Sequence, residues 1–228
     1  MNDTFYIGAY WQNRKRMLDD LINPTLQTLL DLYSVDEQFL NLFELGMSQN
    51  EALKHDVLLT AESIKRLYNE NFNKKDLDQD GFNKIGYRLS LWTGHLEGEA
   101  SAISFNTGSS SKVLTDSCLI NIPYKGHAND RLLQLNNVKK IMSILIRNWD
   151  PEVVVLNSKE LYTALNTTNE IGWVTYINKK KIIKLNNKAI EREDFFGGDL
   201  FYLKTGNSFS YNYDQINSLL YLKKLLCY

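Results

Sequence analysis

The chain has 228 residues, of which 43% are hydrophobic and 12% aromatic. This composition excludes a disordered protein and lets the chain bury a substantial core. The 26 Lys and Arg side chains nearly balance 27 Asp and Glu side chains, which excludes a uniformly basic nucleic-acid-binding surface. Residues 1–100 hold 10 basic and 16 acidic side chains, whereas residues 101–228 hold 16 and 11. The acidic N-terminal half favours a basic partner, unless both halves are ordinary solvated surfaces.

The N-terminal third is expected to form one strand followed by helices. The aromatic segment at residues 4–11 is typical of a short strand. Apolar residues then recur at spacings of three and four, which predicts a helix over residues 14–33, with Pro24 either kinking it or starting a new helix. We expect a short helix between Ser34 and Gly46, and further helical segments at residues 48–54 and 60–71.

Residues 85–106 predict a hairpin around which the sheet is built. Arg88, Ser90 and Trp92 alternate with apolar neighbours, which is the period of two of a half-buried strand. Glycines in residues 93–98 let the chain reverse, and residues 100–106 then alternate in the same way. We therefore expect this hairpin at the centre of the sheet.

The second half of the chain is expected to alternate between strands and helices. Its predicted strands are residues 117–123, 152–156, 172–177, 181–185 and 199–203, and its predicted helices are residues 130–149, 158–165 and 213–226. Residues 172–177 and 181–185 are expected to form a hairpin turned at the lysines between them. Because no linker or repeat interrupts the chain, residues 1–228 are predicted to be a single α+β domain, in which helices pack on a mixed, mostly antiparallel sheet.

An acidic segment before the hairpin offers a possible ion site. Asp76, Asp78 and Asp80, followed by Gly81, match the first half of a calcium-binding EF-hand loop. The second half departs from the pattern, because Tyr87 stands where a bidentate glutamate is required. One alternative function is therefore a small-ligand or calcium-binding regulatory module that uses this loop.

Catalytic patterns are otherwise missing from the sequence. The three histidines lie far apart, and no Asp or Glu has a lysine two positions later, as restriction-endonuclease-type nucleases require. The serine-rich residues 108–112 match neither a nucleophile elbow nor a phosphate loop, and are expected to be a flexible surface loop. We expect no enzyme activity, cofactor or metal.

The remaining classes are limited by cysteine usage and hydropathy. Cys118 lies in an apolar run, which predicts a buried thiol, and with Cys227 it makes neither a zinc pattern nor a disulfide framework. The sequence has neither a secretion signal at its start nor an apolar run of roughly 20 residues that could span a membrane. We therefore expect a cytoplasmic protein that contacts neither membrane nor nucleic acid directly.

The opening segment contains Gly8, Tyr10 and Trp11, followed by Arg14 and Lys15. In these residues it resembles the immunity protein 52 family of bacterial polymorphic toxin systems. That family typically begins with a strand ending in Gly-x-Tyr-Trp, followed shortly by an Arg-Lys pair. The residues that carry the resemblance run in the same order through nearly the whole chain, and they are Gly8, Tyr10, Trp11, Arg14, Lys15, Phe39, Phe43, Gly46, Ser48, Glu51, Ala52, Leu53, Asn73, Asp76, Gly86, Leu89, Leu91, Trp92, Gly94, Trp149, Asp150, Pro151, Gly172, Trp173, Thr175 and Tyr176.

The resemblance implies an inhibitor that neutralises a cognate toxin of a contact-dependent or type VI secretion system. The expected partner is a DNase of restriction-endonuclease fold, blocked at its active site or substrate groove. Because a DNase groove is basic, an acidic antidote surface would gain association rate. The candidate partner-binding residues are Asp76, Asp78, Asp80, Glu97 and Glu99.

Two further expectations concern assembly and packing. The isolated protein is expected to be a monomer or weak homodimer. Trp11, Trp92, Trp149 and Trp173 each end a strand or helix and are expected to anchor the core, and Arg14 is expected to pair with a buried carboxylate.

Overall fold

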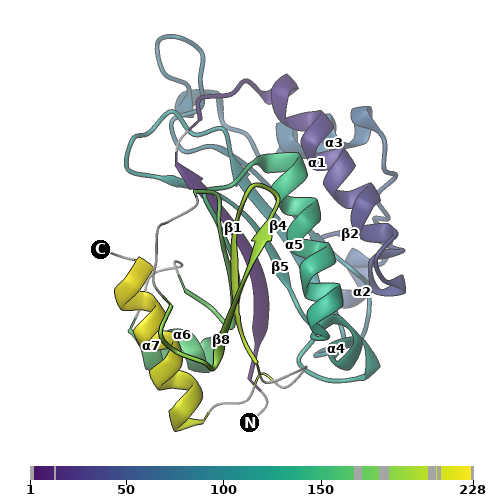
Figure 1. Cartoon of the computed structure of the whole chain (residues 1–228). Coiled ribbons are helices and arrows are strands. Elements are labelled where there is room, and N and C mark those ends of the chain that lie inside the picture. Colours follow the sequence, from purple (N-terminus) through teal and green to yellow (C-terminus); the bar gives the residue numbers. More distant parts are fainter. Residues whose placement is uncertain are drawn as a thin grey trace.

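The computed structural model describes residues 3–12, 14–166, 171–179, 185–204, 209 and 212–226. Its centre is a nine-stranded sheet with the strand order β2-β3-β4-β5-β1-β6-β7-β9-β8, in which every pairing is antiparallel (Figure 1). With helices packed against it, the sheet confirms the predicted α+β class, although it is wholly antiparallel rather than mixed.

The N-terminal strand, rather than the hairpin, occupies the middle of the sheet. Strand β1 (Phe5–Gln12) pairs with β5 (Thr115–Asn121) on one side and with β6 (Val153–Ser158) on the other. The predicted hairpin does form, from β3 (Tyr87–Trp92) and β4 (Ala102–Thr107). The hairpin lies toward an edge of the sheet, because only the two-residue strand β2 (Phe43–Glu44) lies beyond β3.

The other side of the sheet departs from the predicted pairing. Strand β7 (Val174–Ile177) lies between β6 and β9 (Gly198–Leu203) and pairs with both. Residues 181–184 of the predicted partner strand lie outside the described residues, as do Lys180 and Cys227. The edge strand β8 (Ile190–Phe195) was not predicted, since its sequence IEREDF lacks an apolar run.

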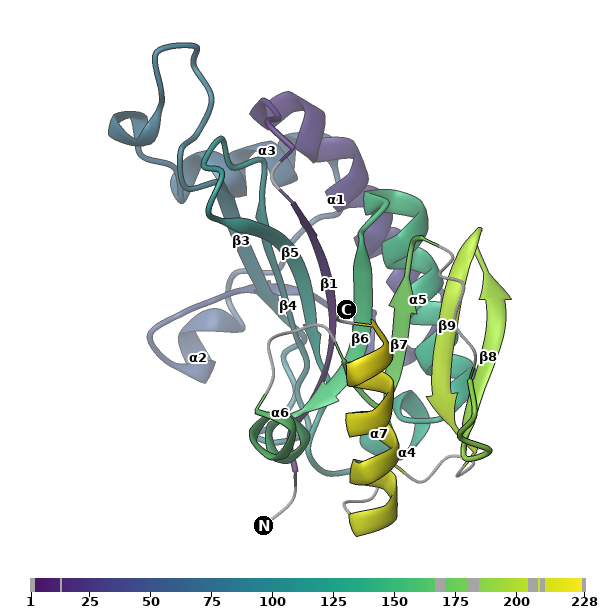
Figure 2. The ribbon, with the colours of Figure 1, turned by 60° about the vertical axis from the view of Figure 1, so that its left-hand side comes forward.

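The helices lie on two sides of the sheet. One face carries α1 (Leu18–Tyr33), α3 (Ala61–Glu70) and α5 (Leu135–Trp149), while α6 (Lys159–Leu165) and α7 (Tyr213–Leu226) lie over β6, β7 and β9 on the other face (Figure 2). The short α2 (Gln49–Ala52) projects at the β2 edge, and α4 (His127–Leu132) lies at one end of the sheet.

Several helix boundaries differ from the sequence prediction. Helix α1 begins at Leu18 and contains Pro24 within one continuous helix. In place of the short helix predicted between Ser34 and Gly46, the chain forms a single 3-10 turn, η1 (Glu37–Phe39). The chain then becomes extended, because Phe43 joins the sheet opposite Trp92. The long helix predicted over residues 130–149 is broken into α4 and α5, because Gln134 is extended and forms the N-cap of α5.

Side-chain caps begin the short helices α2 and α3. The Thr60 side chain accepts a hydrogen bond from the Ser63 N–H at 3.2 Å at the start of α3, and Ser48 caps α2 through the Glu51 N–H. A second 3-10 turn, η2 (Lys74–Asp76), precedes β3. Local hydrogen bonding thus sets these boundaries, as the sequence indicates.

A cluster of buried aromatic rings lies where the C-terminus of α5 meets β1. The Trp149 indole stacks on Trp11 at 5.3 Å between ring centroids, lies 5.7 Å from the Phe105 ring and donates to the Thr28 hydroxyl at 2.9 Å. Trp11, Trp149 and Trp173 are all buried, as predicted. Trp92 is only partly buried, because it lies on the opposite face of the sheet.

Arg14 joins the same junction from the chain after β1. Its guanidinium donates to the carbonyl oxygens of Trp149 at 3.1 Å and Asp150 at 2.6 Å, and pairs with the Asp150 carboxylate at 3.5 Å. The prediction of a buried carboxylate partner is wrong, since the Asp150 side chain is 81% exposed. Asp150 is exposed because it is the left-handed C-cap of α5, at φ 47°.

Candidate partner-binding surface

The outer face of β3, β4 and β5 is open to solvent. Side chains facing α1, α3 and α5 on these strands are buried, whereas Arg88, Ser90, Ser104 and Ser117 on the opposite face are partly or fully exposed. The helices of that second side, α6 and α7, lie over the other half of the sheet (Figure 2). A half-covered antiparallel sheet presents such a face to solvent or to a partner.

An aromatic groove of about 430 Å³ lies at one end of this face. Its floor is made by Tyr6, Ala102 and Asn121, which stand opposite one another on three adjacent strands. Trp92 and Tyr124 add aromatic surface. We use the term aromatic groove for this hollow, which is also lined by Thr4, Phe5, Glu97, Gly98, Ala100, Ser101 and Ile122.

The turn between β3 and β4 forms one wall of the aromatic groove. The N–H groups of Tyr124 and Lys125 both donate to the Gly98 carbonyl, at 2.9 and 3.1 Å. Gly98 has φ 83°, and a Cβ there would lie 2.6 Å from the Tyr124 ring. Glycine at this position therefore allows the Tyr124 ring to lie against the turn.

Tyrosines extend the aromatic surface along β1. The hydroxyls of Tyr6 and Tyr10 hydrogen-bond each other, and Tyr162 of α6 lies nearby. Burial raises the pKa of both Tyr6 and Tyr10, so both hydroxyls remain protonated and able to donate. The Tyr10 ring lies across Gly8, where a Cβ would meet the Tyr10 hydroxyl.

The chemistry of the aromatic groove suits a basic side chain with an apolar stem. Aromatic faces attract a cation that lies over them, and the Glu97 carboxylate at the rim is exposed to solvent. Arginine or lysine from a partner protein would satisfy both features. Tyr6, Trp92 and Tyr124 were not predicted as site residues, although Tyr6 and Trp92 stand at outward-facing positions of their predicted strands.

The five predicted acidic residues do not form one surface. Glu97 and Glu99 lie in the turn after β3, whereas Asp76, Asp78 and Asp80 precede β3. Strand β3 has six residues and spans about 20 Å at roughly 3.3 Å per residue, so the two groups lie at opposite ends of it. Glu97 is exposed and lines the aromatic groove, whereas Glu99 is half-buried.

The Asp76–Gly81 loop is organised by its own hydrogen bonds. The Asp78 carboxylate accepts from the N–H groups of Asp80 and Phe82 at 3.0 and 2.9 Å. A hydrogen bond from the Ser110 side chain, these backbone contacts and the nearby Lys15 hold the pKa of Asp78 below its usual range. Within the described part of the chain, no group of three or more His, Cys, Asp or Glu side chains is placed to hold a metal ion.

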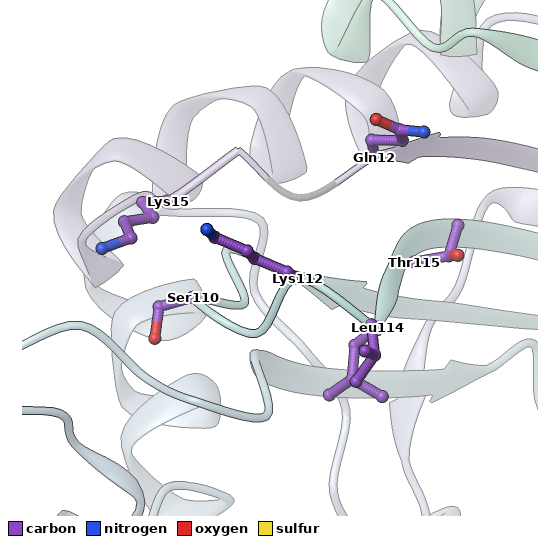
Figure 3. Close-up of a pocket in the computed structure, with 7 residues that line it drawn as sticks. Gln12, Lys15, Ser110, Lys112, Leu114 and Thr115 are labelled. Carbon is purple, nitrogen blue, oxygen red and sulfur yellow. The ribbon is translucent and has the colours of Figure 1, made fainter.

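A second hollow, of about 570 Å³, lies beside this loop (Figure 3). It is lined by Gln12, Lys15, Ser110, Lys112, Val113, Leu114 and Thr115. Figure 3 shows Lys15 and Lys112 near each other, from the chain after β1 and from the β4–β5 loop. Lys15 thus links this hollow to the Asp78 loop, where its positive charge offsets part of the acidic character.

The serine-rich β4–β5 loop is anchored rather than free. The buried Asp116 carboxylate accepts from the N–H groups of Gly108 and Ser109 at 3.0 and 3.2 Å, and the Ser109 hydroxyl donates to the Lys84 carbonyl at 2.7 Å. Burial raises the pKa of Asp116 despite these bonds. The prediction of a flexible loop overlooked this buried acceptor, which only the β4–β5 register brings into reach.

A comparison of the sequence with protein families identifies the chain. The family model for immunity protein 52 matches residues 3–183, which include the aromatic groove and the junction between Arg14 and Trp149. The chain belongs to the immunity protein 52 family. The prediction drawn from the sequence is thereby confirmed, and family membership supports an immunity role.

Structural comparison adds a similar fold to this family assignment. The Pseudomonas aeruginosa T6SS protein PA0821 matches 99% of this immunity protein and 72% of its own chain, with a TM-score of 0.58 and 11% sequence identity. At this identity the likeness shows a shared fold. No curated protein matches the chain. In the part of the chain that the structure describes, none of the helices has the length and apolarity needed to cross a bilayer.

Several family-defining residues prove to be structural. Trp11, Arg14, Trp149 and Asp150 lie far apart in the sequence and meet at the end of α5, on the side of the sheet opposite the aromatic groove. At this junction they tie the chain after β1 to the end of α5.

Proposed function

We propose that this immunity protein binds and neutralises a cognate secreted toxin, a DNase of restriction-endonuclease fold, by covering its active site or substrate groove. The observation that carries the proposal is the match to the immunity protein 52 family over residues 3–183. The structural neighbour is described as a T6SS protein, which supports delivery of the toxin by a type VI secretion system. The protein acts in the cytoplasm as a single domain, in monomeric or weakly dimeric form.

Charge supports a nuclease as the partner. A nuclease surface that holds DNA phosphates is rich in Lys and Arg, and residues 1–100 of the immunity protein carry a net charge of −6 from 10 basic and 16 acidic side chains. Complementary charge raises the association rate and disfavours wrong partners. Inhibition then requires only that a stable interface covers the substrate groove, and no catalytic group on the immunity protein takes part.

The test is co-purification with the toxin domain encoded beside the immunity gene, followed by a DNase assay. We expect a one-to-one complex in which plasmid cleavage is silenced, and no cleavage by the immunity protein alone with Mg²⁺. A toxin that remains unbound and active in the presence of the immunity protein contradicts the proposal. DNA degradation by the purified immunity protein contradicts the absence of catalysis.

A further inference from the structure

The β2 edge of the sheet carries an unusual concentration of exposed apolar side chains. We call residues 43–60 together with the β3–β4 turn, residues 93–99, the edge lobe. Five of its large apolar side chains face solvent, with exposed fractions from 42% to 96%, and they are Leu45, Met47, Leu53, Leu58 and Leu96. Exposed large apolar side chains that gather in one part of a protein favour an interaction site there.

The edge lobe is held in place by specific contacts, so its apolar side chains are not exposed by local unfolding. The Met47 N–H donates to the Glu51 carboxylate at 2.9 Å, and the Gln49 side chain reaches the His95 carbonyl at 3.5 Å. A Cβ on Gly94 would collide with the Phe43 ring and lie 3.3 Å from Leu53, so the turn packs directly on the α2 segment. A pre-organised surface loses little conformational entropy on binding.

Acidic side chains outnumber basic ones in the edge lobe. The edge lobe holds Glu44, Glu51, Asp56, Glu97 and Glu99 against one cation of its own, Lys54, with a formal net charge of −4 when histidines are neutral. Arg66 of α3 pairs with Glu44, so four of the five carboxylates carry the negative charge toward a partner. The predicted acidic loop, Asp76–Gly81, is flanked by Lys74, Lys75 and Lys84, so residues 74–86 together hold three lysines against three aspartates and have no net charge. Charge thus separates the two groups of predicted acidic residues, and only the edge lobe presents a negative field to a basic partner.

The edge lobe is continuous with the aromatic groove. Glu97 belongs to both, and Trp92 of the aromatic groove contacts Phe43 of the edge lobe with ring centroids 6.2 Å apart. The resulting surface combines exposed apolar side chains, acidic side chains and an adjoining aromatic hollow. Stable interfaces share this arrangement, and aromatic residues and Met are enriched at their centres.

We infer that the edge lobe is the docking site for the cognate nuclease, which presents a basic surface with an apolar centre and places an Arg or Lys side chain in the aromatic groove. This inference rests on the proposed function and identifies the contact surface. Glu97 and Glu99 belong to the interface, whereas Asp76, Asp78 and Asp80 lie outside it. Met47 and Leu96 supply apolar contacts.

Binding kinetics with the purified nuclease domain encoded beside the immunity gene test this inference. We expect the double variant Met47→Ser/Leu96→Ser to weaken affinity at least tenfold, mainly through faster dissociation. The matched control is Val113→Ser, since Val113 is 88% exposed but lies on the β4–β5 loop, beyond the other end of β3. Its rates should stay within twofold of the wild type.

Charge reversal provides the second matched pair. Glu97→Lys should slow association several-fold at low salt and flatten its dependence on ionic strength. Asp80→Lys makes the same charge change at an exposed position of the neutral loop, and should leave the association rate within twofold. Circular dichroism confirms that each variant is folded.

The outcomes separate the two proposals. A wild-type protein that binds the nuclease while both edge-lobe variants bind equally well overturns the docking site and leaves the proposed function standing. Equal effects of Asp80→Lys and Glu97→Lys also overturn it. A wild-type protein that does not bind the nuclease defeats the proposed function and the docking site with it. A wild-type dimer that the apolar double variant dissociates, with nuclease binding unchanged, assigns the edge lobe to a second copy and overturns the assigned occupant.

Discussion

The two halves of the sheet are built differently. Strands β6, β7 and β9 are buried along almost their whole length, because α5 covers one face and α6 and α7 cover the other. Strands β3, β4 and β5 alternate between buried and exposed side chains, because helices cover one face. The covered half can thus supply stability, whereas the half-open side leaves a face and an edge free for a partner.

The largest expected difference between the halves concerns two tryptophans. Trp149→Ala removes the buried indole that packs on Trp11 and Phe105, and should lower the free energy of unfolding by about 3–5 kcal/mol. Trp92→Ala removes a partly exposed ring on the open face, and should cost about 1 kcal/mol while weakening toxin binding. Urea denaturation measures both changes. Equal losses would contradict a functional separation of the two faces.

Two glycines test how tightly each region is packed. A Cβ on Gly198 in β9 would collide with the Ile177 carbonyl oxygen, which the sheet holds in place, so Gly198→Ala should cost about 2–3 kcal/mol. A Cβ on Gly8 would meet the Tyr10 ring, which can rotate toward the open face, so Gly8→Ala should cost about 1 kcal/mol. Thermal unfolding of both variants makes the comparison. A larger loss for Gly8→Ala would show that Tyr10 is as fixed as the sheet backbone.

An ion pair secures one end of the open half. Arg131 donates to the Asp36 carboxylate at 2.8 and 2.9 Å, which joins η1 to α4 and holds the pKa of Asp36 below its usual range. Because the pKa is lowered in the folded state, this stability is present above the unfolded pKa of about 4 and is lost as pH falls through the folded pKa. Asp36→Asn should cost about 1 kcal/mol at pH 7, since Arg131 is partly exposed.

Urea denaturation between pH 3 and pH 7 checks the pH dependence. The wild type and Asp36→Asn should converge at the acidic end, where Asp36 becomes protonated. A difference that stays constant across this range would mean that the charge of Asp36 does not contribute.

The smallest expected effects on stability come from two conservative substitutions, one in each half of the sheet, and they have opposite signs. Ser90 and Ser104 face each other across β3 and β4 with hydroxyl oxygens 3.0 Å apart on the open face. Ser104→Thr should stabilise the protein by a few tenths of a kcal/mol, because the added methyl has room and threonine favours strands. Thr175→Ser removes a fully buried methyl from β7 and should cost about 1 kcal/mol. Differential scanning calorimetry resolves the two signs.

Sequence patterns predicted most elements but not their order in the sheet. The alternation at Arg88, Ser90 and Trp92 correctly indicated a strand, and Thr60 correctly marked a helix start. Neither pattern says which strand lies in the middle, because strand order depends on hydrogen bonds between residues far apart in the chain. The charged strand β8 was not predicted for a related reason. Its composition lacks the apolar residues typical of a strand, and hydrogen bonds to β9 hold it extended instead.

The candidate surface was predicted only in part. Glu97 was chosen for its charge, and it does line the aromatic groove. The aspartates at 76, 78 and 80 were chosen on the same ground, but nearby lysines balance them. Tyr6 and Tyr124 are separated by more than half of the chain, so no local pattern could place them in one hollow with Trp92.

The sequence alone determined the α+β class, the family and the absence of a recognisable catalytic pattern, because hydrophobic period and ordered motifs are local properties. The tertiary structure decided that β1 is central, that Trp11, Arg14 and Trp149 form one junction, and that Leu96, Met47 and Glu97 share the edge lobe. These groupings follow from strand pairing and helix packing over long sequence separations. A partner-binding surface is also such a grouping. Charge in the sequence therefore indicated the acidic N-terminal half, but only the fold showed that its two groups of acidic residues lie at opposite ends of β3.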